Sequence, residues 1–142
     1  MKDNYGYVGK VTFEDLVTGK KKTFKNVVTN NFYVKASRLI SGSSVNVISY
    51  IAFGDSTSVP AVTDTVLGNE IYRTSIDSSS VDSTTGEIEF IADIASSEAV
   101  FIWKEVGLFD ASSSGVMTNR SSTTYDHTTG NDVRITYTIS KV

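Results

Sequence analysis

The sequence contains no cysteine and only one proline, Pro60. Without cysteine no disulfide can form, so packing and hydrogen bonds alone must hold the fold. No apolar run approaches the ~20 residues that a membrane-spanning helix needs. Residues 1–6 also lack the apolar core of a signal peptide. We therefore expect a protein that is made in a cytoplasm and has no membrane partner.

Positive charge is also scarce. The formal net charge is −3, and the only basic run is Lys20 to Lys22, which follows a predicted turn. Binding to nucleic acid requires a positive face that neutralises phosphates, and no such run is present. We therefore expect no nucleic-acid partner.

Many of the polar residues carry hydroxyl groups instead of charges: the sequence has 20 Ser and 17 Thr in 142 residues. Thr favours strands and Ser favours turns, so this composition is typical of a β-rich protein with polar loops. The length is sufficient for one domain with a core of its own, and we expect a single domain over residues 1–142.

Alternation of apolar and polar residues predicts a series of strands separated by turn residues. An N-terminal hairpin is expected within residues 1–28, from strands at 5–13 and 22–28. Helical spacing of Phe32, Ala36, Leu39 and Ile40 predicts a helix at 31–41 that ends at Gly42. Further strands are expected at 45–53, 71–81, 87–95, 99–109, 116–122 and 132–140. A short helical turn is expected at 63–70 and a polar loop at 123–131.

This count gives a mainly β fold. We predict an antiparallel β-sandwich of about eight strands with one or two short helices packed on it, whose core spans residues 45–140.

No constellation of catalytic or metal-binding residues is visible. The lone histidine, His127, lies in the predicted polar loop, and we interpret it as an exposed residue without a ligand role. The serines form no Gly-x-Ser-x-Gly elbow, and no Gly-rich phosphate loop occurs. We therefore expect no enzyme activity, no cofactor and no metal. A small hydrolase that uses scattered carboxylates and His127 stays as a weak alternative.

The most apolar and aromatic stretch, residues 101–110, contains the single Trp103 together with a carboxylate, Glu105. Strict alternation would place Glu105 on one strand face with Trp103, Gly107 and Phe109. A charge on such a face costs stability unless it is paired, and Arg is well suited to pair with a carboxylate. We therefore expect Glu105 to pair with Arg120 or Arg73 in a structural or assembly role.

Gly107 carries a separate prediction. A glycine inside an apolar strand is typical of a bulge or of a close approach by another backbone segment.

Three segments together resemble a known family. They are residues 50–55 (YIAFGD), 69–73 (NEIYR) and 104–110 (KEVGLFD), followed by Asn119 and Arg120; the closing strand at 134–139 is also similar. In this order they resemble structural proteins of tailed-bacteriophage virions, and most closely the N-terminal module of tail-collar, tail-fibre and baseplate-associated proteins. The resemblance covers about residues 45 to 140.

The resemblance implies a non-enzymatic building block of a virion, made in the cytoplasm of a host bacterium. It implies a tail, baseplate or fibre-attachment adaptor that packs against copies of itself, as a trimer or ring, and against other virion proteins. Two alternatives stay open. One is a capsid decoration or head-fibre base protein. The other is a carbohydrate-binding β-sandwich whose groove would be lined by Tyr5, Tyr7, Tyr33, Tyr50, Tyr72 or Tyr125.

Overall fold

A computed structural model describes residues 6–128 and 130–142, in which nine strands and one helix are found. Every strand pair is antiparallel. The elements are β1 (Tyr7–Asp15), β2 (Lys21–Val28), α1 (Asn30–Ile40), β3 (Tyr50–Gly54), β4 (Glu70–Ser75), β5 (Ser78–Val81), β6 (Ile88–Ile94), β7 (Ile102–Phe109), β8 (Met117–Asp126) and β9 (Val133–Lys141).

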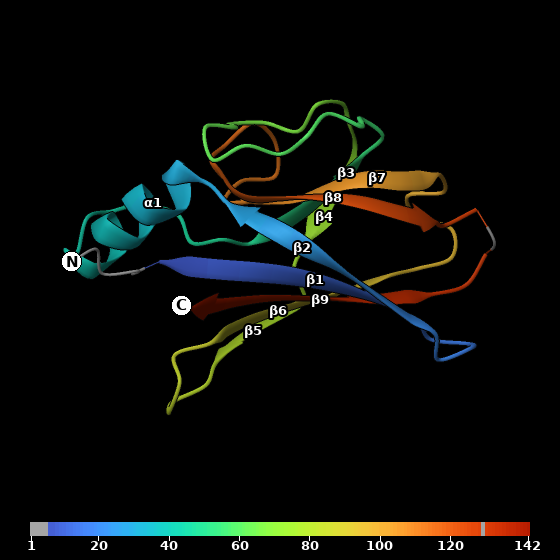
Figure 1. The fold of residues 1–142 in the computed structure, drawn as a ribbon, viewed down its shortest axis with the longest axis horizontal. Coiled ribbons are helices and arrows are strands. Elements are labelled where there is room, and N and C mark those ends of the chain that lie inside the picture. Colours follow the sequence, from blue (N-terminus) through green and yellow to red (C-terminus); the bar gives the residue numbers. More distant parts are fainter. Residues whose placement is uncertain (1–5, 129) are drawn as a thin grey trace.

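The nine strands belong to one curled sheet, in the order β4-β3-β7-β8-β2-β1-β9-β6-β5. The expected mainly β class is thus confirmed, but the expected sandwich of about eight strands in two separate sheets is wrong. Strand β2 connects two halves of the sheet, because it pairs with β1 along most of its length and reaches β8 at Val27 and Val28. Figure 1 shows β2 crossing from the half with β3, β7 and β8 to the half with β9, β6 and β5.

The main core lies inside this curl and takes buried side chains from both halves. Trp103 on β7 is fully buried at its centre, with its ring centroid 5.4 Å from that of Phe13 on β1 and 4.4 Å from that of Phe53 on β3. Because each half contributes one face of the same core, neither half can bury its apolar residues without the other.

The hairpin β1–β2 is central to the sheet. It was expected at the N-terminus, outside the core at 45–140, whereas β1 pairs with β9 and β2 pairs with β8. The end of the first predicted strand at Tyr5 lies outside the described residues. The helix expected at 31–41 runs from Asn30 to Ile40 with Ser41 as its C-cap. Gly42 follows at the predicted C′ position, with a φ of 79°.

Several expected elements differ from those observed. The strand predicted at 45–53 is ordered as a strand only from Tyr50, and residues 63–69 form no helical turn. The strand predicted at 71–81 is divided into β4 and β5, which lie at opposite edges of the sheet. Only β5 pairs with β6, as the hairpin with the turn at 82–86 required. The residues of β4 and of β5 alternate in a similar way, so periodicity alone does not reveal that the chain crosses from one edge of the sheet to the other between them.

In the C-terminal third, the predicted end of β8 is wrong and the predicted pattern of β9 is confirmed. Strand β8 continues to Asp126, although a polar loop was expected from residue 123. Its end is polar on both faces, with Thr123 buried and Thr124 exposed, so no apolar alternation marks it in the sequence. Strand β9 shows the predicted alternation, with Val133, Ile135, Tyr137 and Ile139 all buried in the core.

Candidate functional site

An irregularity in the pairing of β7 with β8 separates Glu105 from the aromatic core. The register against β8 shifts between Trp103 and Glu105, so the two side chains do not share a face as strict alternation predicted. Trp103 lies in the core inside the curl together with Val106 and Leu108. Glu105 projects from the other face of β7, toward the loop that connects β3 to β4.

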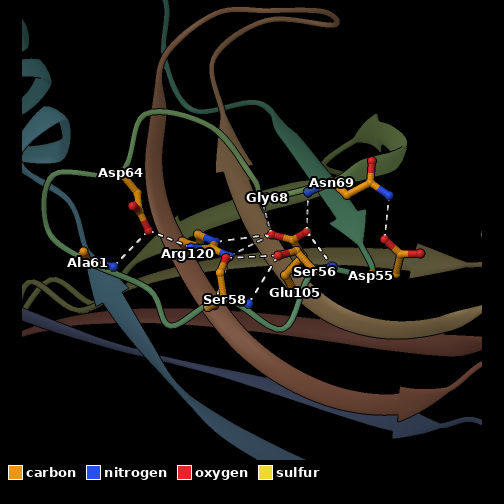
Figure 2. A network of polar contacts seen from close by, with 9 residues as sticks. All are labelled: Asp55, Ser56, Ser58, Ala61, Asp64, Gly68, Asn69, Glu105 and Arg120. Atoms are coloured by element: carbon orange, nitrogen blue, oxygen red, sulfur yellow. Dashed lines mark hydrogen bonds and ion pairs between the residues drawn. The ribbon is translucent and has the colours of Figure 1, made fainter.

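The carboxylate of Glu105 is fully buried and accepts hydrogen bonds from three backbone amides of residues 55–69, which we call the β3–β4 loop. Oε2 accepts from the N–H of Ser56 at 3.0 Å and of Asn69 at 2.8 Å, and Oε1 accepts from the N–H of Gly68 at 2.7 Å. Both ends of the loop are therefore fastened to one side chain of β7 (Figure 2).

Arg120 on β8 completes the site and is 3% exposed. Its Nη2 donates to Glu105 Oε1 at 3.1 Å and to Ser58 Oγ at 2.8 Å, and its Nη1 donates to Asp64 Oδ2 at 2.8 Å. The expected pair of Glu105 with Arg120 is present. One guanidinium thus connects the β7 carboxylate to the middle of the β3–β4 loop, as Figure 2 shows.

The charges in this cluster are matched by partners. Burial raises the pKa of Asp64, but hydrogen bonds from the Ala61 amide and Arg120, with the charge of Arg120, outweigh it and hold that pKa below the usual value. Asp64 therefore stays ionised at neutral pH. Buried charges are tolerated where they are paired and fully hydrogen-bonded, and the Glu105–Arg120 pair meets this condition.

A small apolar cluster lies beside the ion pair and anchors the same loop. Leu67 packs with Ala52, Phe109 and Met117 on this face of the sheet. Gly107 makes room for it, since a Cβ there would lie 3.0 Å from Leu67 Cδ2 and 2.9 Å from the Asn119 carbonyl oxygen. The predicted close approach at Gly107 is present, and the register shifts fall on either side of it.

Arg73 does not reach Glu105, which corrects that alternative. Its guanidinium pairs with Glu70 at 2.5 Å and donates to the carbonyl oxygens of Ala111 and Ser114, near 2.9 Å and 2.8 Å. It also lies 3.7 Å from the ring centroid of Phe109. Arg73 therefore fixes the β7–β8 turn against the edge strand β4, as a second structural contact separate from the ion pair.

A second buried ion pair, which the sequence analysis missed, connects α1 to the end of β7. Lys35 Nζ lies 2.6 Å from Asp110 Oδ2 and 2.6 Å from the carbonyl oxygen of Asn46. Burial raises the pKa of Asp110, but the hydrogen bonds from Lys35 and the Val116 amide outweigh it and hold the pKa below its usual value. The only sequence signal was a Lys among the apolar residues of the helical stripe.

His127 is buried, so the prediction of an exposed loop histidine is wrong. Its imidazole packs on Trp103 with ring centroids 4.6 Å apart. Nδ1 lies 3.1 Å from the Ala99 carbonyl oxygen, and Nε2 lies 2.9 Å from that of Asn131. Both ring nitrogens thus contact backbone, which leaves neither facing a carboxylate. His127 in this arrangement has no ring nitrogen open to a substrate, which is the position that a general base in the hydrolase alternative would need.

The tyrosines expected to line a sugar-binding groove are instead mostly part of the packing. Tyr7, Tyr72 and Tyr125 pack against the main core and Tyr50 packs against the smaller cluster, while Tyr33 is more exposed. Tyr5 lies outside the described residues. Burial and the contact with Glu98 raise the pKa of Tyr72, which is consistent with a hydroxyl engaged within the protein.

Within residues 6–128 and 130–142, no cluster of three or more His, Cys, Asp or Glu is positioned to hold a metal ion. Over the same residues, no helix has the length and apolarity required to cross a membrane.

Comparison with known proteins adds no identification: no protein-family model matches the chain, and neither a curated protein nor a solved structure shows significant similarity to it.

Proposed function

We propose that this chain is a non-enzymatic structural protein of a tailed-bacteriophage virion, acting as a tail, baseplate or fibre-attachment adaptor through subunit packing. One observation carries the proposal beside the sequence resemblance. The buried pair of Glu105 and Arg120 holds a loop that carries exposed aliphatic side chains.

The β3–β4 loop presents its apolar side chains to solvent. Val59 is 86% exposed, Val66 is 64% exposed and Val62 is 53% exposed. Exposed aliphatic residues on one fixed loop are costly to a solitary protein and typical of a contact surface. A loop already ordered before contact loses little further conformational entropy on binding, which favours its use as a recognition element.

The same contacts argue against a role in chemistry. Both oxygens of Glu105 and the N–H groups of Arg120 are committed to the loop and to each other. A general acid or base needs a free position within hydrogen-bond reach of a substrate. Structural contacts account for both Glu105 and Arg120. We therefore favour the role of a structural adaptor over that of a hydrolase.

The experiment that tests this proposal is a protein inventory of phage particles. Particles purified from the bacterial strain that encodes the chain should contain it at a constant ratio to the major tail protein across preparations. Antibody labelling in electron micrographs should then place it on the tail or baseplate; labelling on the head would instead support the decoration or head-fibre alternative.

A phage protein that acts only during replication is the matched control and should be depleted by the same purification. Absence of the chain from particles that retain full tails and fibres would contradict the proposed function.

A further inference from the structure

The four neighbouring strands β2, β1, β9 and β6 present an outer face that carries regular rows of side chains. Side chains alternate along each strand, so that Val11 on β1 and Ile135 on β9 point into the core and their neighbours point outward. The register places the outward residues in three cross-strand rows, which we call the outer face. The rows are Lys25, Lys10, Thr138 and Glu89; Thr23, Thr12, Thr136 and Ile91; and Lys21, Glu14, Arg134 and Asp93.

The outer face is accessible in the single chain. Lys10, Lys25, Asp93 and Arg134 are all exposed. Helix α1 packs on the opposite side of the sheet, where its Phe32 belongs to the main core. A partner that lies flat on these four strands therefore meets no obstacle from the helix.

The charges in the first row are not balanced within one copy. Lys10 and Lys25 lie directly opposite each other on adjacent strands, and like charges in such a pair are destabilising. Glu89 lies on β6, on the far side of β9, and Glu87, which accepts a hydrogen bond from Ser140, adds to this acidic side. Over residues 6–128 and 130–142, none of Lys10, Lys25 and Glu89 forms an ion pair. A partner with the opposite pattern would compensate these charges.

The outer face is complementary to itself. A two-fold axis that runs between β1 and β9, parallel to both, places β1 of one copy on β9 of a second copy and β2 on β6. Each row keeps its position along the strands and meets its own reverse. The opposing pairs are then Lys25 with Glu89, Lys21 with Asp93, Glu14 with Arg134, and Thr12 with Thr136.

Two other two-fold arrangements of the same face bring like charges together. An axis across the strands, through the middle row, sets Lys25 on Lys21 and Glu89 on Asp93. An axis along β9 sets Arg134 on Arg134 of the second copy. The charge pattern therefore selects the axis between β1 and β9.

We infer that two copies of this chain associate through their outer faces about a two-fold axis between β1 and β9, with Lys25 of each copy against Glu89 of the other. Four strands at ~4.8 Å spacing and three rows at ~6.8 Å give roughly 400 Å² per copy. This area is at the low end for a specific contact, so the dimer should dissociate on dilution. The contact closes after two copies, and a trimer or ring requires a second, different contact. The inference deepens the proposed subunit packing and rests on it.

Charge reversal tests the inference. Lys25→Glu alone and Glu89→Lys alone each replace two attractive contacts with two repulsive ones, and each should raise the dissociation constant more than about tenfold. A 1:1 mixture of the two variants should dimerise, because opposite charges face each other again at both contacts. The double variant Lys25→Glu/Glu89→Lys should dimerise by itself for the same reason. Sedimentation velocity over a series of protein concentrations measures all four samples beside the wild-type chain.

The control is Arg38→Glu, which makes the same change in charge at an exposed position of α1 and should leave the dimer unchanged. Added salt should weaken the wild-type dimer, because its ion pairs lie at the surface. Circular dichroism melts check the fold. Lys25→Glu should melt no lower than the wild-type chain, since it removes the repulsion with Lys10.

A wild-type chain that stays monomeric at the highest concentration would overturn the inference, as would a dimer that survives either single reversal. If the single variants are monomeric and neither their mixture nor the double variant dimerises, Lys25 does not face Glu89, and the inference also fails. Failure of the proposed function is recognised separately. A chain that dimerises but is absent from purified particles contradicts the virion role, whereas a monomeric chain found in particles contradicts only the dimer.

Discussion

At the scale of single residues, Glu105 and Arg120 determine how the loop is held. Each is almost fully buried and each makes several hydrogen bonds to the β3–β4 loop. Breaking a buried pair by removing one partner is costly because groups on the other side lose their bonds without regaining water.

Glu105→Ala should therefore lower the free energy of unfolding by about 3–5 kcal/mol, measured by urea denaturation. Three loop amides and Arg120 lose their acceptor at once. Asp93→Ala is the matched control: Asp93 and its partner Arg134 are each 45% exposed, and the expected loss is below about 1 kcal/mol. Equal losses for the two variants would contradict a special role for the buried carboxylate.

The Lys35–Asp110 pair predicts a specific loss of stability in acid. Folding lowers the pKa of Asp110 below its ordinary value of 3.8, so the native state binds this proton less readily than the unfolded state does. The stabilisation is full above pH 3.8 and disappears as the pH falls through the lower native pKa.

Thermal melts between pH 6 and pH 2 test this expectation. The difference in melting temperature between the wild-type chain and Asp110→Asn should be largest at pH 6 and should shrink below pH 4. Asp55→Asn is the control, because Asp55 is exposed and its partner is the neutral side chain of Asn69. A wild-type advantage over Asp110→Asn that stays constant down to pH 2 would refute the linkage.

At the scale of elements, β7 shows how a strand can serve two packing layers. The register shift after Trp103 places aromatic packing on one face and the ion pair on the other. Beyond this shift, Gly107 leaves room for Leu67 to pack on the strand, and this contact helps to hold the β3–β4 loop.

Gly107→Ala should destabilise the protein by about 1–3 kcal/mol, the usual cost of overpacking. The new Cβ would lie 2.9 Å from a backbone oxygen and 3.0 Å from Leu67. Denaturant titration of Gly107→Ala, Leu67→Ala and the double variant measures the effect. The double variant should lose less than the sum of the single losses, because removing the Leu67 side chain relieves one clash. Strict additivity would show that the two positions are not coupled.

At the scale of the whole molecule, the two halves of the curled sheet are held together more by their shared core than by the strand pairing of β2 with β8. Only Val27 and Val28 of β2 pair with β8, whereas the core takes large side chains from both halves. The halves should therefore fold and unfold together.

A single cooperative transition is expected in urea. Trp103, the only tryptophan, lies at the centre of the shared core, so its fluorescence reports the packing of both halves. Its unfolding curve should coincide with the loss of β-structure followed by far-ultraviolet circular dichroism. Two separated transitions would show that the halves are independent units.

The sequence alone determined the local features of this protein. Strict alternation identified β9, turn residues at 82–86 located the β5–β6 hairpin, and helical spacing with Gly42 located α1, because each depends on neighbours in the chain. The need of a buried carboxylate for a partner also indicated Arg120 or Arg73, of which the structure shows Arg120. Tertiary structure decided the rest. Four features depend on residues distant in sequence, which periodicity does not record: the division of 71–81 between two sheet edges, the register shift after Trp103, the burial of His127 and the Lys35–Asp110 pair.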